Sequence, residues 1–342
     1  MKNNKKILVI GYFGYKNNQL DGQTIKTRSI YTILKQYSND IIYPIDTQQL
    51  HGKKLFPLLK FIKRLFFAKK IVIIPAGNAL KYIFPICCLF TFFKSLDIIM
   101  IPVGGWLSWY IEDHKLLKSL LFKTKIILPQ TMKEVNNLKN KGYNVEYFPN
   151  FRITNFIPNI KVVSNRFKIV FFARIHKMKG LDIIFKLANM IKNSNMNNIS
   201  IDFYGQIEPD HKDYFMNGIK GYNFMHYKGY LKSPNIYPTL QNYDVLLFPT
   251  QYINDEGFPG SILDCYIAGV PVIASNWQHA DEFVSDKESG LICAYDKVDE
   301  FYSAIMKLYS DKIFLSKLKK GALNESVKYS ESSAYDIIKK YL

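Results

Sequence analysis

The chain has 342 residues, enough for two domains with separate hydrophobic cores. Hydrophobic residues make up 48% of it and aromatic residues 15%, which excludes a disordered chain. Residues 1–160 carry 24 Lys and Arg against 8 Asp and Glu, so +16 of the net charge of +18 lies in the first half. This asymmetry predicts an anionic partner for that half, either nucleic acid or an anionic membrane surface. The alternative is a general surface preference for lysine in a chain rich in Lys and Asn.

No segment predicts a membrane span. The longest apolar stretch, YIFPICCLFTFF (82–93), has 12 residues and contains a proline, whereas a spanning helix needs about 20 residues. The run ILVI near the N-terminus is too short for a signal peptide and predicts a first strand. The four cysteines have no metal-like spacing, so we expect reduced, buried thiols in a cytoplasm.

Strand and helix patterns alternate through the first half. The strand-like runs are continuous in Ile and Val, which is what parallel strands covered on both faces require. Residues 22–37 have apolar side chains close to one face and predict a helix. Residues 149–166 are polar, contain two prolines and predict a linker. The expected β-rich runs of the first half are 5–14, 41–46, 70–76, 97–105 and 125–131.

The same rhythm restarts after the linker. It predicts an α/β protein with two doubly wound, Rossmann-like parallel-sheet domains, in which ligands bind beyond the carboxyl ends of the strands. We expect an N-terminal domain at 1–155, a C-terminal domain at 156–330 and a final helix at 331–342 that packs back on the first domain. The expected strands of the second half are 167–174, 198–205, 244–250 and 270–275, and the expected helices are 180–193, 303–308, 313–324 and 333–342.

The loop after the strand at 167–174 carries three cations before a helix. Arg174, Lys177 and Lys179 precede a helix that is expected to begin near Gly180. Cations are poorly placed at a helix N-terminus unless an anion lies between them and the helix amides, as phosphate does in many nucleotide sites. The pattern therefore indicates a phosphate site, with a solvated basic loop as the alternative.

The stretch NDEGFPGSILDCYIAGVPVIAS follows the strand at 244–250. Gly257 and Gly260 allow the backbone to approach a ligand closely, and the amides near Ser261 lie at a helix start. Asp264, in the first turns of that helix, and Glu256, before it, are expected to face one crevice. One carboxylate suits a ribose diol and the other suits sugar hydroxyls. The alternative is that Asp264 only complements the helix dipole and Glu256 is a turn residue.

These motifs resemble the retaining GT-B glycosyltransferases that carry an E-x7-E signature (glycosyltransferase family 4-like). The resemblance spans most of residues 167–292 and rests on Arg174-x4-Lys179-Gly180 and on EGFPGSILD. Asp264 stands where Glu is usual, which resembles the members that build bacterial surface polysaccharides. More weakly, residues 17–28 resemble the glycine loop that closes over the donor, and 102–106 and 147–150 resemble other segments of the family.

The resemblance implies a GT-B fold and a role for each motif residue. Arg174 and Lys179 would hold the diphosphate of a nucleotide sugar and stabilise the charge that grows on it, Glu256 would bind donor sugar hydroxyls, and Asp264 would bind the ribose. No cofactor or metal is expected, because no D-x-D motif occurs, and EPDHKD (208–213) is interpreted as a solvated loop. The implied catalytic residues are Glu256, Arg174 and Lys179; the donor-binding residues are Gly22, Arg174, Lys179, Glu256, Gly257, Phe258, Gly260, Ser261 and Asp264; the acceptor-side residues are Gly104 and Gly105.

The segment KKLFPLLKFIKRLFFAKK (53–70) combines apolar residues at helical spacing with Lys60, Lys63 and Arg64. This pattern is typical of a helix lying in an anionic membrane interface. The alternative is an amphipathic helix packed on the domain's own sheet. An acceptor sugar on a polyprenyl diphosphate would require membrane docking, which favours the interface. The apolar residues at helical spacing are Leu55, Leu58, Leu59, Ile62, Leu65 and Phe66.

The sequence thus predicts a retaining glycosyltransferase that transfers one sugar from a UDP- or GDP-sugar to a lipid-linked saccharide. It would serve capsule, O-antigen, lipopolysaccharide or exopolysaccharide synthesis, in the cytoplasm, peripherally on the inner face of the cytoplasmic membrane. One alternative is a nucleotide-sugar epimerase of similar shape. Another is a nucleic-acid-binding protein, although no recognisable nucleic-acid-binding motif accompanies the charge.

Overall fold

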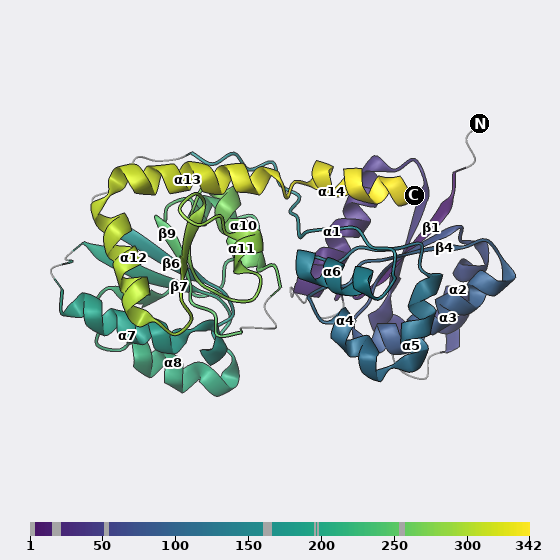
Figure 1. The fold of residues 1–342 in the computed structure, drawn as a ribbon, viewed down its shortest axis with the longest axis horizontal. Helices are drawn as coiled ribbons and strands as arrows, with labels where there is room; N and C mark the ends of the chain where they lie inside the picture. Colours follow the sequence, from purple (N-terminus) through teal and green to yellow (C-terminus); the bar gives the residue numbers. More distant parts are fainter. Residues whose placement is uncertain are drawn as a thin grey trace. The chain divides into compact units, whose positions relative to one another are not determined.

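The computed structural model describes residues 4–15, 22–50, 55–159, 166–194, 196, 198–252 and 257–342. The chain divides into two compact units. The N-terminal unit comprises Met1–Ile153 and Ser330–Leu342, and the C-terminal unit comprises Thr154–Tyr329. The last helix of the chain therefore belongs to the N-terminal unit (Figure 1).

The N-terminal unit has a five-stranded sheet in the order β2-β1-β3-β4-β5. All its paired strands are parallel. The continuous apolar runs explain this arrangement, because every residue of β3 is buried and helices cover both faces. All five expected strands are present, and all except β2 end earlier than the apolar runs suggested. The strands are β1 (Lys6–Gly11), β2 (Ile41–Asp46), β3 (Lys70–Ile74), β4 (Asp97–Met100) and β5 (Ile126–Ile127).

Two hydrophobic cores lie on the two faces of this sheet. One core takes side chains from α2, α3 and α5, and the other from α1 and α14. Figure 1 shows where these helices lie. The helices are α1 (Gly22–Tyr37), α2 (Leu55–Phe67), α3 (Phe84–Phe93), α4 (Leu107–Tyr110), α5 (Lys115–Leu120), α6 (Met132–Asn140) and α14 (Glu331–Ile338). Shorter helical turns are η1 (Thr47–Leu50), η2 (Ala79–Ile83), η3 (Ile111–Asp113), η4 (Leu121–Lys123) and η7 (Lys339–Tyr341).

Helix α14 is held in the N-terminal unit by both apolar and polar contacts. Ala334 and Ile338 are buried in the same core as α1. The Tyr335 hydroxyl donates to the backbone oxygen of Tyr37 at 3.0 Å, and Lys340 Nζ lies 2.5 Å from a carboxylate oxygen of Glu146. The C-terminal segment thus completes a core formed by residues about 300 positions earlier in the chain.

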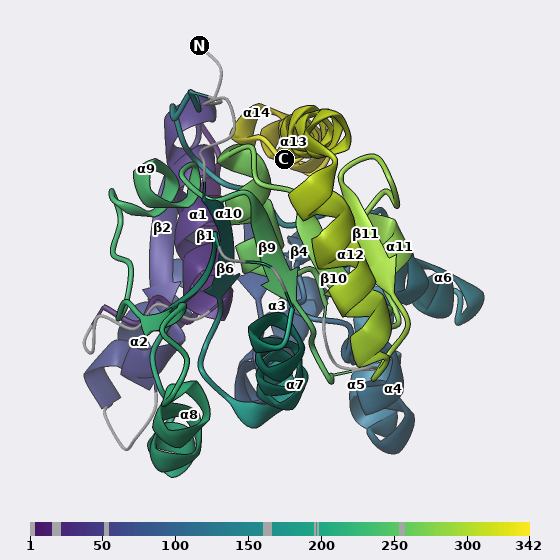
Figure 2. The same ribbon diagram turned by 90° about the vertical axis from the view of Figure 1, so that its left-hand side faces the viewer.

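The C-terminal unit has a six-stranded sheet in the order β11-β10-β9-β6-β7-β8. Figure 2 labels β11, β10, β9 and β6 of this sheet. Its paired strands are also parallel. Strands β8 and β11 were not among the expected strands. The strands are β6 (Phe167–Phe172), β7 (Ile199–Tyr204), β8 (Met225–Tyr227), β9 (Val245–Phe248), β10 (Val272–Ser275) and β11 (Gly290–Cys293).

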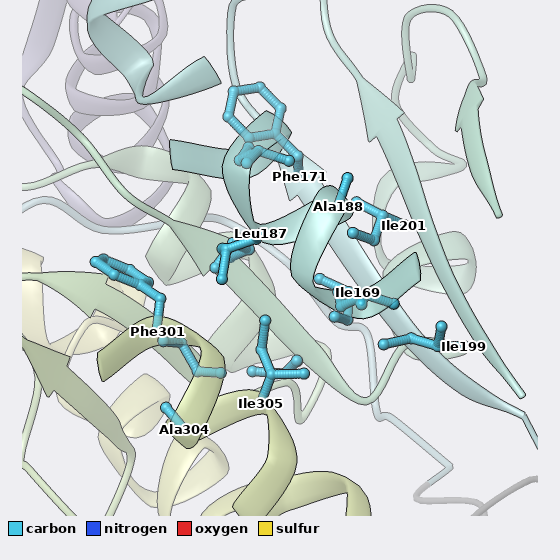
Figure 3. Packing of buried hydrophobic residues seen from close by; sticks show 14 of the residues in the cluster. Ile169, Phe171, Leu187, Ala188, Ile199, Ile201, Phe301, Ala304 and Ile305 are labelled. Carbon is cyan, nitrogen blue, oxygen red and sulfur yellow. The ribbon is translucent and has the colours of Figure 1, made fainter. Parts of the chain in front are cut away.

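Helices α7 and α12 cover one face of this sheet. Figure 3 shows Leu187 and Ala188 of α7, and Phe301 and Ile305 of α12, packed beside strand residues such as Ile201. Helix α10 contributes to a separate core that also contains residues of β9 and β10. The helices are α7 (Leu181–Lys192), α8 (Lys212–Ile219), α9 (Ile236–Leu240), α10 (Gly260–Ile267), α11 (Ala280–Phe283), α12 (Val298–Ser310) and α13 (Lys312–Val327), with short turns η5 (Lys177–Lys179) and η6 (Pro209–His211).

The strand order creates one topological switch point in the C-terminal unit. The chain builds outward from β6 through β7 to β8, and then returns to place β9 on the other side of β6. Strands β6 and β9 are neighbours, but they are followed by helices on opposite faces of the sheet, α7 after β6 and α10 after β9. Ligands of doubly wound sheets bind in the crevice at such a point.

None of the helices in the described part of the chain is both long enough and apolar enough to cross a membrane.

Candidate functional site

The loop after β6 leads into α7 through a glycine that no other residue can replace without strain. Gly180 has φ +86° and is the N-cap of α7. A Cβ atom at this position would lie 1.9 Å from the backbone oxygen of Pro249, in the loop after β9. Both the left-handed conformation and the close approach require glycine. The Arg174–Gly180 loop is thereby packed against the loop after β9.

Further contacts join these two loops at the switch point. The Gln251 N–H donates to the backbone oxygen of Met178 at 2.8 Å. Lys179 Nζ lies 5.0 Å from the ring centroid of Tyr252 and 5.7 Å from that of Phe248. These cation–π contacts fix the ammonium group beside the β9 strand end. The end of the β6 loop, with Lys179, therefore lies beside the first residues of the β9 loop.

Arg174 lies at the start of the β6 loop and is exposed. Its side chain is 62% exposed, and its Nη1 lies 2.8 Å from Oε1 of Glu208. Glu208 follows β7, the strand that pairs with β6. The ion pair thus links two neighbouring loops at the carboxyl edge of the sheet.

Glu208 also lies between two histidines, a relationship that the sequence analysis missed. His176 Nε2 is 3.5 Å from Glu208 Oε2, and the rings of His176 and His211 have centroids 4.3 Å apart. The interpretation of 208–213 as a solvated loop is therefore wrong for Glu208 and His211. The signal that would have found them is positional, because the loops after adjacent parallel strands meet at one edge.

His176, Glu208 and His211 offer ligand atoms within 4.8 Å of one another, so a metal site must be considered. His176 Nδ1 accepts the Met178 N–H at 3.1 Å, which places the proton of the neutral ring on Nε2. A metal-binding imidazole normally donates from its second nitrogen instead. Burial lowers the pKa of His176, and this effect outweighs the opposing influence of Glu208. This tautomer does not suit a metal ligand at Nε2, and the carboxylate of Glu208 is the charged group that the two rings face.

Helix α10 begins at Gly260, within the described segment that starts at Gly257. Gly260 and Ser261 form its first turn, where backbone N–H groups have no partner within the helix. Asp264 lies one turn further, is 7% exposed, and accepts a hydrogen bond from the Tyr237 hydroxyl at 3.3 Å. The carboxylate is therefore held in place by a residue of α9.

Two other motif residues need separate mention. The ring of Phe258 is buried and stacks on Phe283, with centroids 4.2 Å apart, so this ring belongs to the core. Any contact of Phe258 with a ligand would come from its backbone. Gly257 is half-buried, and Glu256 lies outside the described residues.

The N-terminal unit presents its own candidates at the carboxyl edge of its sheet. Gly22 is the exposed first residue of α1, with open space where a Cβ would stand. Gly104 follows β4, has φ +91°, and donates its N–H to Gln130 Oε1 at 3.3 Å; Gly105 is half-buried beside it. Gln130 is 2% exposed, and its Nε2 has no hydrogen-bond partner among the described residues. The sequence analysis did not identify this buried donor.

Comparison with known proteins identifies the family. Residues 153–325, just over half of the chain, match the family model "Glycosyl transferases group 1". This segment contains Arg174, Lys179 and Asp264. A search of curated protein sequences finds no match.

Solved structures show the same fold over the whole chain. A sucrose-phosphate synthase from Thermosynechococcus elongatus has a TM-score of 0.76 at 14% identity, with 98% of each chain covered. Anabaena Alr3699/HepE in complex with UDP has a TM-score of 0.74 at 14% identity, again with 98% of each chain covered. A glycosyltransferase from Rickettsia africae has a TM-score of 0.73 at 15% identity, covering 99% of this chain and 98% of that one. The chain therefore has the two-domain GT-B fold and belongs to the group 1 glycosyl transferases.

Proposed function

We propose that the protein is a retaining glycosyltransferase that uses a nucleotide-sugar donor and a lipid-linked saccharide acceptor in bacterial surface-polysaccharide synthesis. The observation that carries the proposal is the junction of the β6 and β9 loops at the switch point. There, the β6 loop with Lys179 contacts the first residues of the β9 loop, and α10 follows further along the chain. Anabaena HepE, which has the same fold, was solved with UDP and with UDP-glucose, which favours a UDP-sugar over a GDP-sugar as the donor.

The proposed chemistry centres on the leaving group. When the bond between sugar C1 and the diphosphate oxygen breaks, negative charge develops on the diphosphate. Arg174, Lys179 and the first N–H groups of α10 supply fixed positive charge and dipoles for it. The acceptor hydroxyl forms the new bond to C1 and gives its proton to the departing diphosphate, which leaves as a nucleoside diphosphate. Transfer on the same face of the sugar accounts for retention.

The two acids of the resemblance have different proposed roles. Asp264 binds the ribose hydroxyls, since it is already held by Tyr237 and lies one turn from the α10 amides. Glu256 binds the donor sugar next to C1. The proposed reaction uses no metal ion and no further cofactor, because cationic side chains supply the charge that a metal would otherwise provide.

The N-terminal unit is proposed to bind the acceptor. Gly104 and Gly105 form an acceptor-side loop, and the buried Nε2 of Gln130 is a donor suited to a sugar hydroxyl. The net charge of +16 over residues 1–160 suits the anionic inner face of the cytoplasmic membrane, where a lipid-linked acceptor resides. The enzyme would attach there peripherally.

The test is a panel of UDP- and GDP-sugars incubated with purified lipid-linked saccharides. We expect transfer of one sugar with retention, read by mass spectrometry and by the anomeric proton coupling of the product. An epimerase would convert the donor without any acceptor, and that outcome would overturn the proposal. Low concentrations of UDP should protect the protein from thermal unfolding and oligonucleotides should not, whereas the reverse would indicate a nucleic-acid-binding protein.

A further inference from the structure

Helix α2 has one face in the core and another in solvent. Phe61 and Leu65 are buried against the sheet of the N-terminal unit. Phe56, Leu59 and Phe66 are 78%, 57% and 67% exposed. At 100° per residue these exposed side chains fall on the opposite side of the helix from Phe61 and Leu65. The helix thus packs on its own sheet and presents exposed apolar side chains to solvent, with Lys60 and Lys63 on the same side.

Helix α3, next to α2, carries exposed apolar side chains of its own. Leu89, Phe92 and Phe93 are 53%, 64% and 78% exposed. The two helices are held together where α2 ends, because Lys94, directly after α3, donates to the backbone oxygens of Leu65 at 2.6 Å and Phe66 at 2.8 Å. Figure 1 shows α2 and α3 side by side. Exposed aromatic residues on neighbouring helices are typical of a surface that enters a membrane interface.

A basic pocket of about 280 Å³ adjoins the exposed face of α2. Cations line it together with two aromatic rings, and no acidic residue is among its described lining. Phe67 belongs both to the pocket and to the exposed face, because its side chain is 53% exposed. The lining residues are Lys6, Tyr43, Lys60, Lys63, Arg64 and Phe67.

The strands hold part of this lining in place. Arg64 Nη1 donates to the backbone oxygen of Pro44 in β2 at 3.0 Å, and its guanidinium lies 5.1 Å from the Tyr43 ring centroid. Lys6 of β1 places its Nζ 5.2 Å from the ring centroid of Phe67. Four cations around one cavity repel one another unless an anion lies among them. An anion bound here would be next to the apolar face, which is the geometry of a phospholipid.

We propose that this pocket binds the phosphodiester headgroup of an anionic phospholipid while the aromatic side chains of α2 and α3 enter the acyl boundary. The proposal deepens the membrane attachment of the proposed function by assigning it a site. Attachment then depends on headgroup chemistry as well as on surface charge. Lys6 distinguishes a headgroup pocket from attachment through helix α2 alone, because it lines the pocket but belongs to β1 and not to the helix.

The experiment compares two vesicle types of equal zeta potential, one charged by phosphatidylglycerol and the other by oleate. We expect the wild-type protein to sediment with the phosphatidylglycerol vesicles at least fivefold more strongly. Lys6→Gln and, separately, Lys60→Gln should lose this preference. Lys35→Gln is the matched control, since Lys35 is an exposed lysine on α1, which packs on the opposite face of the sheet. Phe92→Ser/Phe93→Ser should weaken binding to both vesicle types equally.

Equal binding to both vesicle types, or an equal effect of Lys6→Gln and Lys35→Gln, would overturn the headgroup site. Inorganic phosphate that displaces the protein as well as glycerophosphoglycerol does at the same ionic strength would also overturn it, in favour of a free-phosphate site. The assay contains no nucleotide sugar, so its outcome is independent of transferase activity. Unchanged melting temperatures of the variants establish that they fold.

Discussion

Arg174 Nη1 and Glu208 Oε1 lie 2.8 Å apart, which joins the loop after β6 to the loop after β7. With Arg174 62% exposed, solvent screens the pair, and its contribution to the free energy of unfolding is at most about 1 kcal/mol. Its importance lies in orientation. A guanidinium held in place before the donor arrives stabilises the leaving diphosphate without further ordering of the side chain.

Glu208→Ala should therefore lower kcat by about fivefold, which corresponds to about 1 kcal/mol, with little change in the melting temperature. Glu208→Gln should retain more activity, because its amide oxygen still accepts from Arg174. Initial rates at saturating donor measure both effects. Equal loss in the two variants would show that the charge of Glu208, and not the orientation of Arg174, matters.

Arg174→Ala and Lys179→Ala should each lower kcat by about 10²–10³-fold, since each removes a charge-assisted contact to a developing anion worth about 3–4 kcal/mol. Both should also weaken UDP binding in calorimetry. Lys177→Ala is the control in the same loop, because Lys177 Nζ faces Asp182 at 3.6 Å and is assigned no contact with the donor. Unchanged turnover in either test variant would remove that residue from the site.

Asp264→Asn and Glu256→Gln should fail in different ways. Asp264→Asn should weaken UDP binding, because the amide is a poorer acceptor for the ribose diol. Glu256→Gln should leave UDP binding unchanged and lower turnover, since its proposed contact is with the sugar. Calorimetry with UDP beside initial rates separates the two. The opposite pattern would mean that the roles of the acids are exchanged.

The sequence predicted the long central strands well, because a continuous apolar run such as that of β3 has few alternatives to a buried parallel strand. It missed β8, which has three residues, MHY, and owes its conformation to pairing with β7. Strand β11 begins at Gly290, where a Cβ would lie 2.4 Å from the backbone oxygen of Val272, a contact that only the fold reveals.

The candidate site shows the same division. The sequence around Gly180 and Gly260 correctly predicted two loops that follow strands and precede helices. A glycine at the start of a helix can be recognised from the neighbouring residues alone. Partners from another loop left no local signal. Glu208 is 34 positions from Arg174, and Gln130 is 26 positions from Gly104. Pairings of this kind depend on strand order, which periodicity does not encode.

The pH dependence of stability should report on His176. Burial lowers its pKa below the usual value of 6.5. At a pH between the lowered pKa of the folded chain and the usual pKa of the unfolded chain, His176 binds a proton only in the unfolded chain. The free energy of unfolding therefore decreases as the pH falls below about 6.5. Protonation also removes the acceptor for the Met178 N–H. His176→Asn keeps a cap acceptor at every pH. Its melting temperature should fall less than that of the wild type between pH 7.5 and 5.5, and parallel curves would contradict this assignment.

Gly180→Ala should be strongly destabilising and should abolish UDP binding. The left-handed backbone alone costs a residue with a Cβ about 1–2 kcal/mol. In addition, the new methyl group would lie 1.9 Å from the Pro249 oxygen, so the β6 and β9 loops must separate.

Gly221→Ala isolates the first effect, because Gly221 has φ +92° and nothing within 4 Å of the position of its Cβ. Urea denaturation should show a loss of about 1–2 kcal/mol for Gly221→Ala and at least twice that for Gly180→Ala, with calorimetry showing normal UDP binding only in the former. Equal losses, with UDP binding retained in both, would mean that the two loops do not need to touch for the donor to bind.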